Sequence, residues 1–472
     1  MSTTTTPTIT ETKKLGLFSA IAIVSGSMIG SGIFLVTPDT ARVMGTGGLM
    51  MAAWALACVV TFLGARAYSK LAAYLPQAGG QYVFLKEAFG PIPAFLYGWV
   101  FFWIIQTGVL AAVSMAFAKY VGVLWPLIND SPLVILPLGL SISTEKLLAM
   151  VCLAGLTWIN SRGLTYGALL QNVFTVLKVA ALLALIGFGL GMGNLIATPG
   201  AIDWSLKLPE SAGGFAQGLL PALAVATVGP LFSSDSWAYV TFLGGDVKNP
   251  SKTLPQALFW GTLIVLSLYL LANLAYLNVL PLSAIQTAPQ DKVAASMFSA
   301  LVGPIGSTCI SVLIMVSTFG CLNGMLLSGA RVFYALAKDG LLFKAFAKLD
   351  PKTQTPNTSL LAQLGWACCL LLSGSYSQLL GFTIFTALVF YIATIAGLMR
   401  LGKQNPEALQ MKTFGDWLVP VLYLVLVCGI AGVLLVAPQT ATTSWIGLGL
   451  TFMGLPFYFW MQGRQKVTAP VV

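Results

Sequence analysis

The sequence predicts an all-α polytopic membrane protein with twelve transmembrane helices, ten of which form two inverted repeats of five. Composition is the first observation: of 472 residues, 57% are hydrophobic and 8% are charged, and the mean hydropathy is +0.87. These values are typical of a chain that crosses a bilayer many times. The second observation is the number of apolar runs long enough to span. The third is that the first and sixth runs are interrupted near their middles.

Twelve runs are long enough to span, and they lie near residues 15–44, 48–74, 91–122, 145–162, 168–192, 215–241, 255–279, 304–335, 357–374, 379–400, 417–438 and 443–462. With a cytosolic N-terminus, 18 of the 24 Lys and Arg residues fall on the cytosolic side, five fall outside and one, Lys178, falls within the membrane. Cytoplasmic loops are enriched in Lys and Arg. Both polar tails, 1–14 and 463–472, are therefore expected in the cytosol.

The segment between the second and third runs, residues 76–91, is amphipathic and bounded by Gly and Pro. We predict a short helix there. A loop made of turn residues is the alternative.

The first run contains a stretch poor in helix formers, residues 24–34, which reads Val-Ser-Gly-Ser-Met-Ile-Gly-Ser-Gly-Ile-Phe. Each Gly in a helix costs about 1 kcal/mol relative to Ala. Opened backbone is tolerated in a bilayer only where it lines a cavity or is buried in protein. We predict a helix broken near its middle. The alternative is an intact helix in which Gly26 and Gly30 form a small-residue packing face.

The sixth run contains residues 229–237, Gly-Pro-Leu-Phe-Ser-Ser-Asp-Ser-Trp. Pro230 removes a backbone donor and kinks a helix, and the Ser and Asp side chains compete with helical hydrogen bonds. Runs one and six each begin a group of five, so the two groups cross the membrane in opposite senses. This predicts an inverted repeat of 15–192 and 215–400, followed by two further spans over 417–462. Matching interrupted helices point to a midplane binding site.

Together the two breaks offer groups that fit a small zwitterion. The positive end of the half-helix near Ser31, Gly32 and Ile33 favours a carboxylate. Carbonyl groups suited to an ammonium lie at the ends of the preceding half-helices, near Ser27, Met28, Ile29, Leu231, Phe232 and Ser233. An amino acid has both charges, although other small polar solutes would satisfy the same arrangement.

Two charged residues, Lys178 and Asp235, lie deep within apolar runs, and ionisable groups at such depth are functional candidates. The alternative for Lys178 is a side chain that extends to water, but about ten helical residues at ~1.5 Å each precede it. Asp235 is either an N-cap for the second half of span six or a group that contacts the substrate's side chain. Trp237, on the break itself, is either a gate or ordinary packing.

Several classes of function are disfavoured. The net charge of +10 does not indicate nucleic-acid binding, because most of the basic residues fall on the cytosolic side of the predicted spans. The seven cysteines lie in or beside apolar runs without metal-ligand spacing, and there is no histidine, so no disulfide framework, metal site or cofactor is predicted. No nucleophile has a base beside it and there is no acid pair, which argues against an enzyme.

Seven motifs, spread over nearly the whole chain, resemble the amino acid–polyamine–organocation (APC) superfamily, and most closely its L-amino-acid transporter-like branch. They occupy residues 29–34, 76–82 with 89–95, 233–237, 249–250 with 254–255, 317–324, 328–340 and 454–458. Each is weak alone, but seven in the right order on the right spans are specific. The resemblance implies a LeuT-like fold of five plus five helices with alternating access.

The resemblance also implies roles at the breaks. Backbone amides of Ser31, Gly32 and Ile33 would bind the carboxylate of an amino-acid substrate. The ring of Phe232 would close over that substrate as a gate.

The resemblance further implies that the ammonium of Lys178 replaces the sodium ion of sodium-coupled relatives, beside the first break and near Ser317 and Cys321. Sodium-independent exchange of neutral L-amino acids is the implied function. Because a buried lysine releases its proton more readily than an exposed one, proton-coupled uptake is the alternative. A channel or a non-transporting amino-acid sensor is a third hypothesis.

Two features depart from the branch. Residues 233–237 read Ser-Ser-Asp-Ser-Trp where many relatives have Tyr or Phe and glycines, so side-chain selectivity does not carry over and Asp235 leaves cationic substrates open. The loop 125–145 has no cysteine, where the eukaryotic light subunits use one to bind a glycoprotein. We therefore expect a stand-alone carrier of a bacterial cell (inner) membrane, without a disulfide-linked heavy chain.

Overall fold

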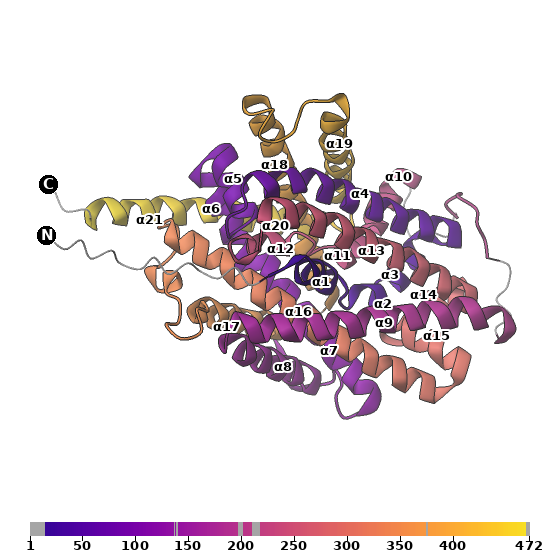
Figure 1. The fold of residues 1–472 in the computed structure, drawn as a ribbon. Helices are drawn as coiled ribbons and strands as arrows, with labels where there is room; N and C mark the ends of the chain where they lie inside the picture. The colour runs from indigo at the N-terminus through magenta and orange to yellow at the C-terminus, as the bar shows by residue number, and fades with distance from the viewer. Residues whose placement is uncertain are drawn as a thin grey trace, which may run out of the picture.

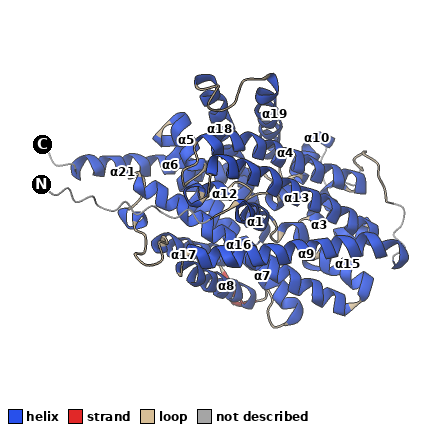
Figure 2. Ribbon diagram, in the orientation of Figure 1, coloured by secondary structure: helices blue, strands red, loops and turns tan. Residues whose placement is uncertain are grey.

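The computed structural model describes residues 15–135, 137, 140–196, 202–209, 218–373 and 376–468. Helices dominate its regular structure; a short antiparallel hairpin of β1 (Pro132–Ile135) and β2 (Ser141–Ser143) lies in the loop after the third span (Figure 2). In this described part, eight helical segments are long and apolar enough to cross a membrane: Leu17–Leu35, Gly47–Tyr74, Pro91–Leu124, Gln171–Gly193, Pro250–Val279, Pro304–Lys338, Thr383–Gln404 and Phe414–Val436. The protein is an all-α polytopic membrane protein.

The helices of the first half match the predicted runs. They are α1 (Leu17–Met28), α2 (Gly32–Leu35), α3 (Thr37–Met44), α4 (Gly47–Tyr74), α5 (Gln81–Phe89), α6 (Pro91–Val100), the π-helical turn η1 (Phe101–Gln106), α7 (Thr107–Leu124), α8 (Thr144–Ser161) and α9 (Leu164–Ile196). The short helix predicted between the second and third spans is α5, so that prediction is confirmed.

The helices of the second half also cover the predicted runs. They are α10 (Leu219–Ala226), α11 (Val228–Ser233), α12 (Tyr239–Phe242), α13 (Pro250–Val279), α14 (Leu282–Gln286), α15 (Val293–Val302), α16 (Pro304–Lys338), α17 (Asn357–Ser373), α18 (Tyr376–Gln404), α19 (Phe414–Val436), α20 (Ala441–Phe452) and α21 (Gly454–Thr468). Short 3₁₀ turns lie at Gly244–Asp246, Pro289–Asp291 and Lys344–Ala347. Each predicted run contains helix.

Local sequence explains where several helices begin and end. The Thr46 hydroxyl accepts a hydrogen bond from the amide of Leu49 and caps α4, and Ser143 caps α8 through the amide of Lys146. Gly45 ends α3 with a left-handed φ of 69°, which glycine adopts without steric cost.

The helix α1 lies at the centre of the bundle, packed against α9, α13 and α16 (Figure 1). Helices α5 and α21 lie toward one end of the bundle, on the left of the view, and α10 and α14 lie toward the other. The core is therefore built around the first half of the interrupted span, which places its break deep in the protein.

Candidate substrate-binding site

The first span is interrupted where the sequence predicted. Helix α1 ends at Met28 and α2 begins at Gly32, with Ile29 turned out of helical geometry (ψ 84°). The last carbonyl groups of α1 are thereby removed from the helical ladder and accept hydrogen bonds from other helices.

Lys178 of α9 supplies two of those hydrogen bonds. Its ammonium nitrogen lies 2.6 Å from the carbonyl oxygen of Gly26 and 3.1 Å from that of Ile29. The side chain is fully buried, and none of the ion pairs among the described residues includes it. Its charge is therefore stabilised by carbonyl dipoles at the C-terminal end of α1, where a cation is favoured.

Helix α16 supplies two further hydrogen bonds to carbonyl groups at the first break. The Ser317 hydroxyl donates to the Ile29 carbonyl at 3.2 Å, and the Cys321 thiol donates to the Ser27 carbonyl at 3.0 Å. Gly30 faces Cys321 so closely that a Cβ on Gly30 would lie 2.8 Å from the sulfur. The structure thus brings Ser317 and Cys321 to the same short segment as Lys178.

Two more residues of α9 face α1 in line with Lys178. The Thr175 hydroxyl donates to the Ala22 carbonyl at 3.0 Å. The Gln171 amide lies against Gly26 of α1 and against Gly324 of α16, where a Cβ on Gly324 would be 2.9 Å from its nitrogen. Gln171 and Thr175 were not predicted as site residues, although their spacing from Lys178 places all three on one helix face.

The sixth span is also interrupted at the predicted place. Helix α11 ends at Ser233, and α12 begins only at Tyr239. Ser236, between them, has a left-handed φ of 68°. The Ser234 hydroxyl is 2.9 Å from that of Thr61 on α4, which anchors the break.

Asp235 is not the N-cap of the second half of span six. The chain stays in turns beyond Asp235, and the N-cap of α12 is Ala238, which makes no side-chain capping bond. The buried Asp235 carboxylate instead accepts a hydrogen bond from the Tyr391 hydroxyl at 2.7 Å. Trp237 stacks on Tyr391, with ring centroids 5.2 Å apart, and meets Tyr68 edge-on.

The two breaks touch each other. A Cβ on Gly32 would lie 2.6 Å from the Cβ of Ser233 and 2.7 Å from its Cα. The Tyr269 hydroxyl of α13 lies 2.8 Å from the Met28 carbonyl and 3.1 Å from the Ser233 carbonyl, so it joins both breaks. A second tyrosine of α13, Tyr276, donates to the Ile33 carbonyl at 3.2 Å.

A cavity of about 10 Å³ remains where the breaks meet. Nine predicted site residues line it: Ser27, Met28, Gly30, Ser31, Gly32, Phe232, Ser233, Asp235 and Cys321. Four unpredicted residues complete the lining: Val109, Val113, Ser236 and Met325. The predicted residues Ile29, Ile33 and Trp237 do not line it, and neither do Lys178 and Ser317, which contact the Ile29 carbonyl instead. The volume is at the lower limit for one water molecule, so the breaks are packed too tightly in this structure to hold an amino acid.

A set of contacts away from the cavity joins Leu15, at the start of the first span, to the segment around Asp246. The Leu15 amide donates to the Asp246 carbonyl at 3.1 Å, and the Lys248 amide donates to the Leu15 carbonyl at 2.8 Å. Arg331 of α16 pairs with the Asp246 carboxylate at 3.2 Å. These contacts tie the start of the first span to the segment that follows the second break.

Another set of contacts lies at the opposite end. Arg42 of α3 pairs with Asp39 on its own helix and with Asp291 at 2.8 Å. It also donates to the Gln286 carbonyl at 2.6 Å. Helix α3, at the C-terminal end of the first predicted span, is therefore fixed to the end of α14 and to the 3₁₀ turn Pro289–Asp291.

Comparison with known proteins finds similarity along nearly the whole chain. The amino acid permease family matches residues 15–456. The serine/threonine exchanger SteT of Bacillus subtilis (strain 168) is 29% identical over 96% of this chain and 98% of its own length. The large neutral amino acids transporter small subunit 2 of Mus musculus is 29% identical over 95% of this chain and 80% of its own. The Asc-type amino acid transporter 1 of Homo sapiens is 32% identical over 88% and 76%, respectively.

These relatives are transporters and not enzymes. The family match covers nearly all of the chain, and it includes both helix breaks and Lys178. The chain belongs to the amino acid permease family of the APC superfamily, in its L-amino-acid transporter-like branch.

Proposed function

We propose that this chain is a sodium-independent exchanger of small and medium neutral L-amino acids that works by alternating access. The observation that carries the proposal is the buried ammonium of Lys178 on the carbonyl oxygens of Gly26 and Ile29. In transporters with interrupted helices, such carbonyls coordinate the coupling cation. A fixed positive charge at this position repels a second cation, because unscreened like charges a few ångströms apart interact strongly.

The substrate's two charged groups would be bound at the breaks. The amides of Ser31, Gly32 and Ile33 at the start of α2 bind the carboxylate. The ammonium binds carbonyl oxygens of the breaks, among them those of Ser27 and Phe232, since a carbonyl oxygen that accepts one hydrogen bond keeps a second lone pair. The ring of Phe232, which lines the cavity, closes over the substrate.

The apolar part of the lining favours neutral substrates. Val109, Val113 and Met325 surround the cavity together with Phe232, and the acid at its edge, Asp235, already accepts a hydrogen bond from Tyr391. Relatives named for serine and threonine, for large neutral amino acids and for Asc-type substrates support this class.

The proposed organisation is the LeuT-like one: repeats over 15–192 and 215–400, two further spans over 417–462, and both termini in the cytosol of a bacterial cell. The contacts of Asp246 and of Arg42 are then the inner and outer closures, which open in turn. The loop 125–145 has no cysteine, so no disulfide-linked heavy chain is part of the proposal.

Two alternative functions are each supported by a specific observation. Asp235 lines the cavity and joins none of the ion pairs found in the described residues, which favours carriage of cationic amino acids. Lys178 is buried without an acidic partner among the same pairs, which favours proton-coupled uptake with Lys178 as the titrating group.

The test is uptake of radiolabelled serine, leucine and lysine into proteoliposomes that contain the purified full-length chain. The interior is empty, loaded with an unlabelled amino acid, or alkaline. Exchange predicts serine or leucine uptake only into loaded vesicles. Uptake into empty alkaline vesicles would establish proton coupling, and uptake of lysine in place of neutral substrates would establish a cationic carrier.

A further inference from the structure

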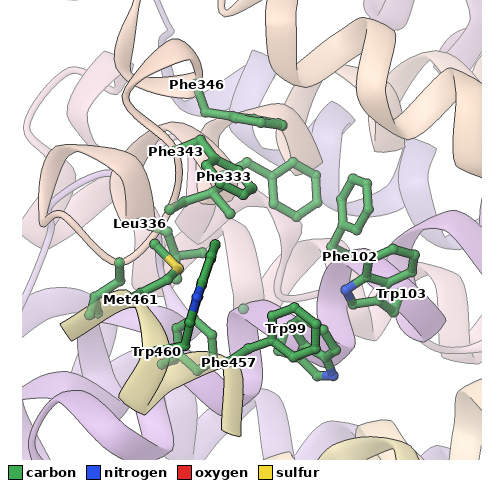
Figure 3. A pocket seen from close by; sticks show the side chains of 14 residues that line it. Trp99, Phe102, Trp103, Phe333, Leu336, Phe343, Phe346, Phe457, Trp460 and Met461 are labelled. Atoms are coloured by element: carbon green, nitrogen blue, oxygen red, sulfur yellow. The ribbon is translucent and has the colours of Figure 1, made fainter. Parts of the chain in front are cut away.

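A second cavity, of about 250 Å³, lies on the outside of the bundle, away from both breaks. Its walls come from α6, η1, α16, the segment around Lys344–Ala347, and α21. Figure 3 shows the rings of Trp99, Phe333, Phe343 and Trp460 arranged around this space. Every lining residue is apolar or glycine, and nine are aromatic. Such a lining offers nothing to a polar substrate and fits a hydrocarbon chain.

The cavity is open to the surroundings of the bundle. Phe343 is 56% exposed, Phe457 is 47% exposed and Trp460 is 46% exposed. In a protein embedded in a bilayer these rings face lipid. Tryptophan is enriched where the hydrocarbon core meets the headgroups, which places this cavity near one membrane surface.

Positive charge lies beside the aromatic lining. Lys344 stands between the lining residues Phe343 and Phe346, and Lys348 follows shortly after; both side chains are exposed. Neither belongs to an ion pair among the described residues. The acid at the end of α16, Asp339, is already paired with Lys86 at 2.8 Å. Basic residues close to a membrane surface attract anionic lipid headgroups.

We propose that this cavity binds an anionic phospholipid of the cytosolic leaflet, with an acyl chain among the aromatic rings and the phosphate at Lys344 and Lys348. The leaflet assignment rests on the proposed orientation, whereas the binding itself does not. This lipid site does not follow from the proposed exchange activity or from what the relatives are named for.

Ring contacts connect the cavity wall to the second broken helix. The ring of Phe333, which lines the cavity, lies 5.7 Å from that of Phe101, centroid to centroid. The Phe101 ring in turn lies 5.4 Å from that of Phe242, in α12. A bound acyl chain would pack against this row of rings from the lipid side and so stabilise the position of α12, the half-helix that follows the second break.

The test uses the full-length chain in phosphatidylcholine vesicles that contain a trace of phosphatidylglycerol with a photoreactive group at the end of one acyl chain. A parallel preparation uses phosphatidylcholine with the same group. After illumination, labelled peptides are mapped by mass spectrometry. Because the probe is present in both leaflets, the result does not depend on the orientation or on transport.

We expect the phosphatidylglycerol probe to label the peptides around Trp99, Phe333 and Phe457 more strongly than it labels the lipid-facing surface of α19. The phosphatidylcholine probe is expected to label these peptides less strongly than the phosphatidylglycerol probe does. The change Lys344→Gln with Lys348→Gln is expected to lower the labelling about five-fold for each lysine. Lys403→Gln, an exposed lysine of α18, is the matched control and should leave labelling unchanged.

Even labelling of all lipid-facing helices would overturn the proposal. So would the absence of label from the cavity peptides in both preparations, as expected if the chain's own tail or a second copy filled the cavity. Equal labelling by the two probes, unchanged in the lysine variant, would refute the headgroup site.

Discussion

The ammonium of Lys178 lies 2.6 Å from the carbonyl oxygen of Gly26, although the two residues are 152 positions apart in the chain. A buried charge is costly unless hydrogen bonds compensate it. Here the compensation comes from a helix that ends in mid-protein. The break in the first span therefore supplies the carbonyl groups that hold a fixed cation.

Lys178→Ala is expected to reduce exchange at least about ten-fold, since hydrogen bonds to a charged group contribute ~1.5–3 kcal/mol each. The carbonyl oxygen of Gly26 would lose its partner. The measurement is initial exchange of labelled serine in proteoliposomes, with Lys207→Ala, a change at an exposed lysine, as the control. Wild-type exchange by Lys178→Ala would remove Lys178 from the mechanism.

Tyr269→Phe removes the hydroxyl that lies between the Met28 and Ser233 carbonyls. Loss of one hydrogen bond of about 1 kcal/mol corresponds to about a five-fold change. We expect a fall in exchange rate of that order with normal amounts of folded protein. Tyr334→Phe, at a ring that lies beside Lys338, should have no effect; equal losses in the two variants would show that the Tyr269 hydroxyl has no special role.

Gly32→Ala tests the contact between the breaks. Its new methyl group would collide with Ser233, including the backbone, and overpacking of this kind costs ~1–3 kcal/mol. Exchange should be lost, and Gly32→Ala with Ser233→Gly should recover only part, because the clash with the Cα remains. Gly187→Ala, which meets nothing within 4 Å, controls for the substitution itself. Normal exchange by Gly32→Ala would contradict the closed packing.

Asp235→Asn distinguishes the substrate classes. Asparagine keeps an oxygen that accepts the hydrogen bond from Tyr391 but removes the negative charge. A neutral exchanger should keep most of its serine exchange in this variant. If external lysine competes with serine in the wild type and no longer competes in Asp235→Asn, the cationic alternative holds.

The helix breaks and the buried lysine could be predicted from sequence because each violates a strong rule. Glycine, serine and proline in an apolar run disfavour a continuous helix, and a charge in mid-membrane requires a reason. These are local signals, and they located eight of the residues that line the cavity, whereas Cys321 was predicted from the family resemblance.

The partners of the breaks could not be predicted in the same way. Tyr269 and Met28 are 241 positions apart, and a tyrosine in an apolar span is not exceptional. Trp237 lies on the break in sequence, yet its ring packs between Tyr391 and Tyr68. Which face a residue presents in a non-helical segment depends on tertiary packing, which periodicity does not report. Asp235 failed as a cap for the same reason: the length of the turn after α11 determines where α12 begins.

The most direct test of the central claim is exchange of labelled serine with sodium replaced by choline on both sides of the vesicle membrane. If the Lys178 ammonium occupies the place of a coupling cation, wild-type exchange should require internal amino acid and run at the same rate in both salts. A rate that collapses in choline, or uptake into empty vesicles driven by a sodium gradient, would contradict that account.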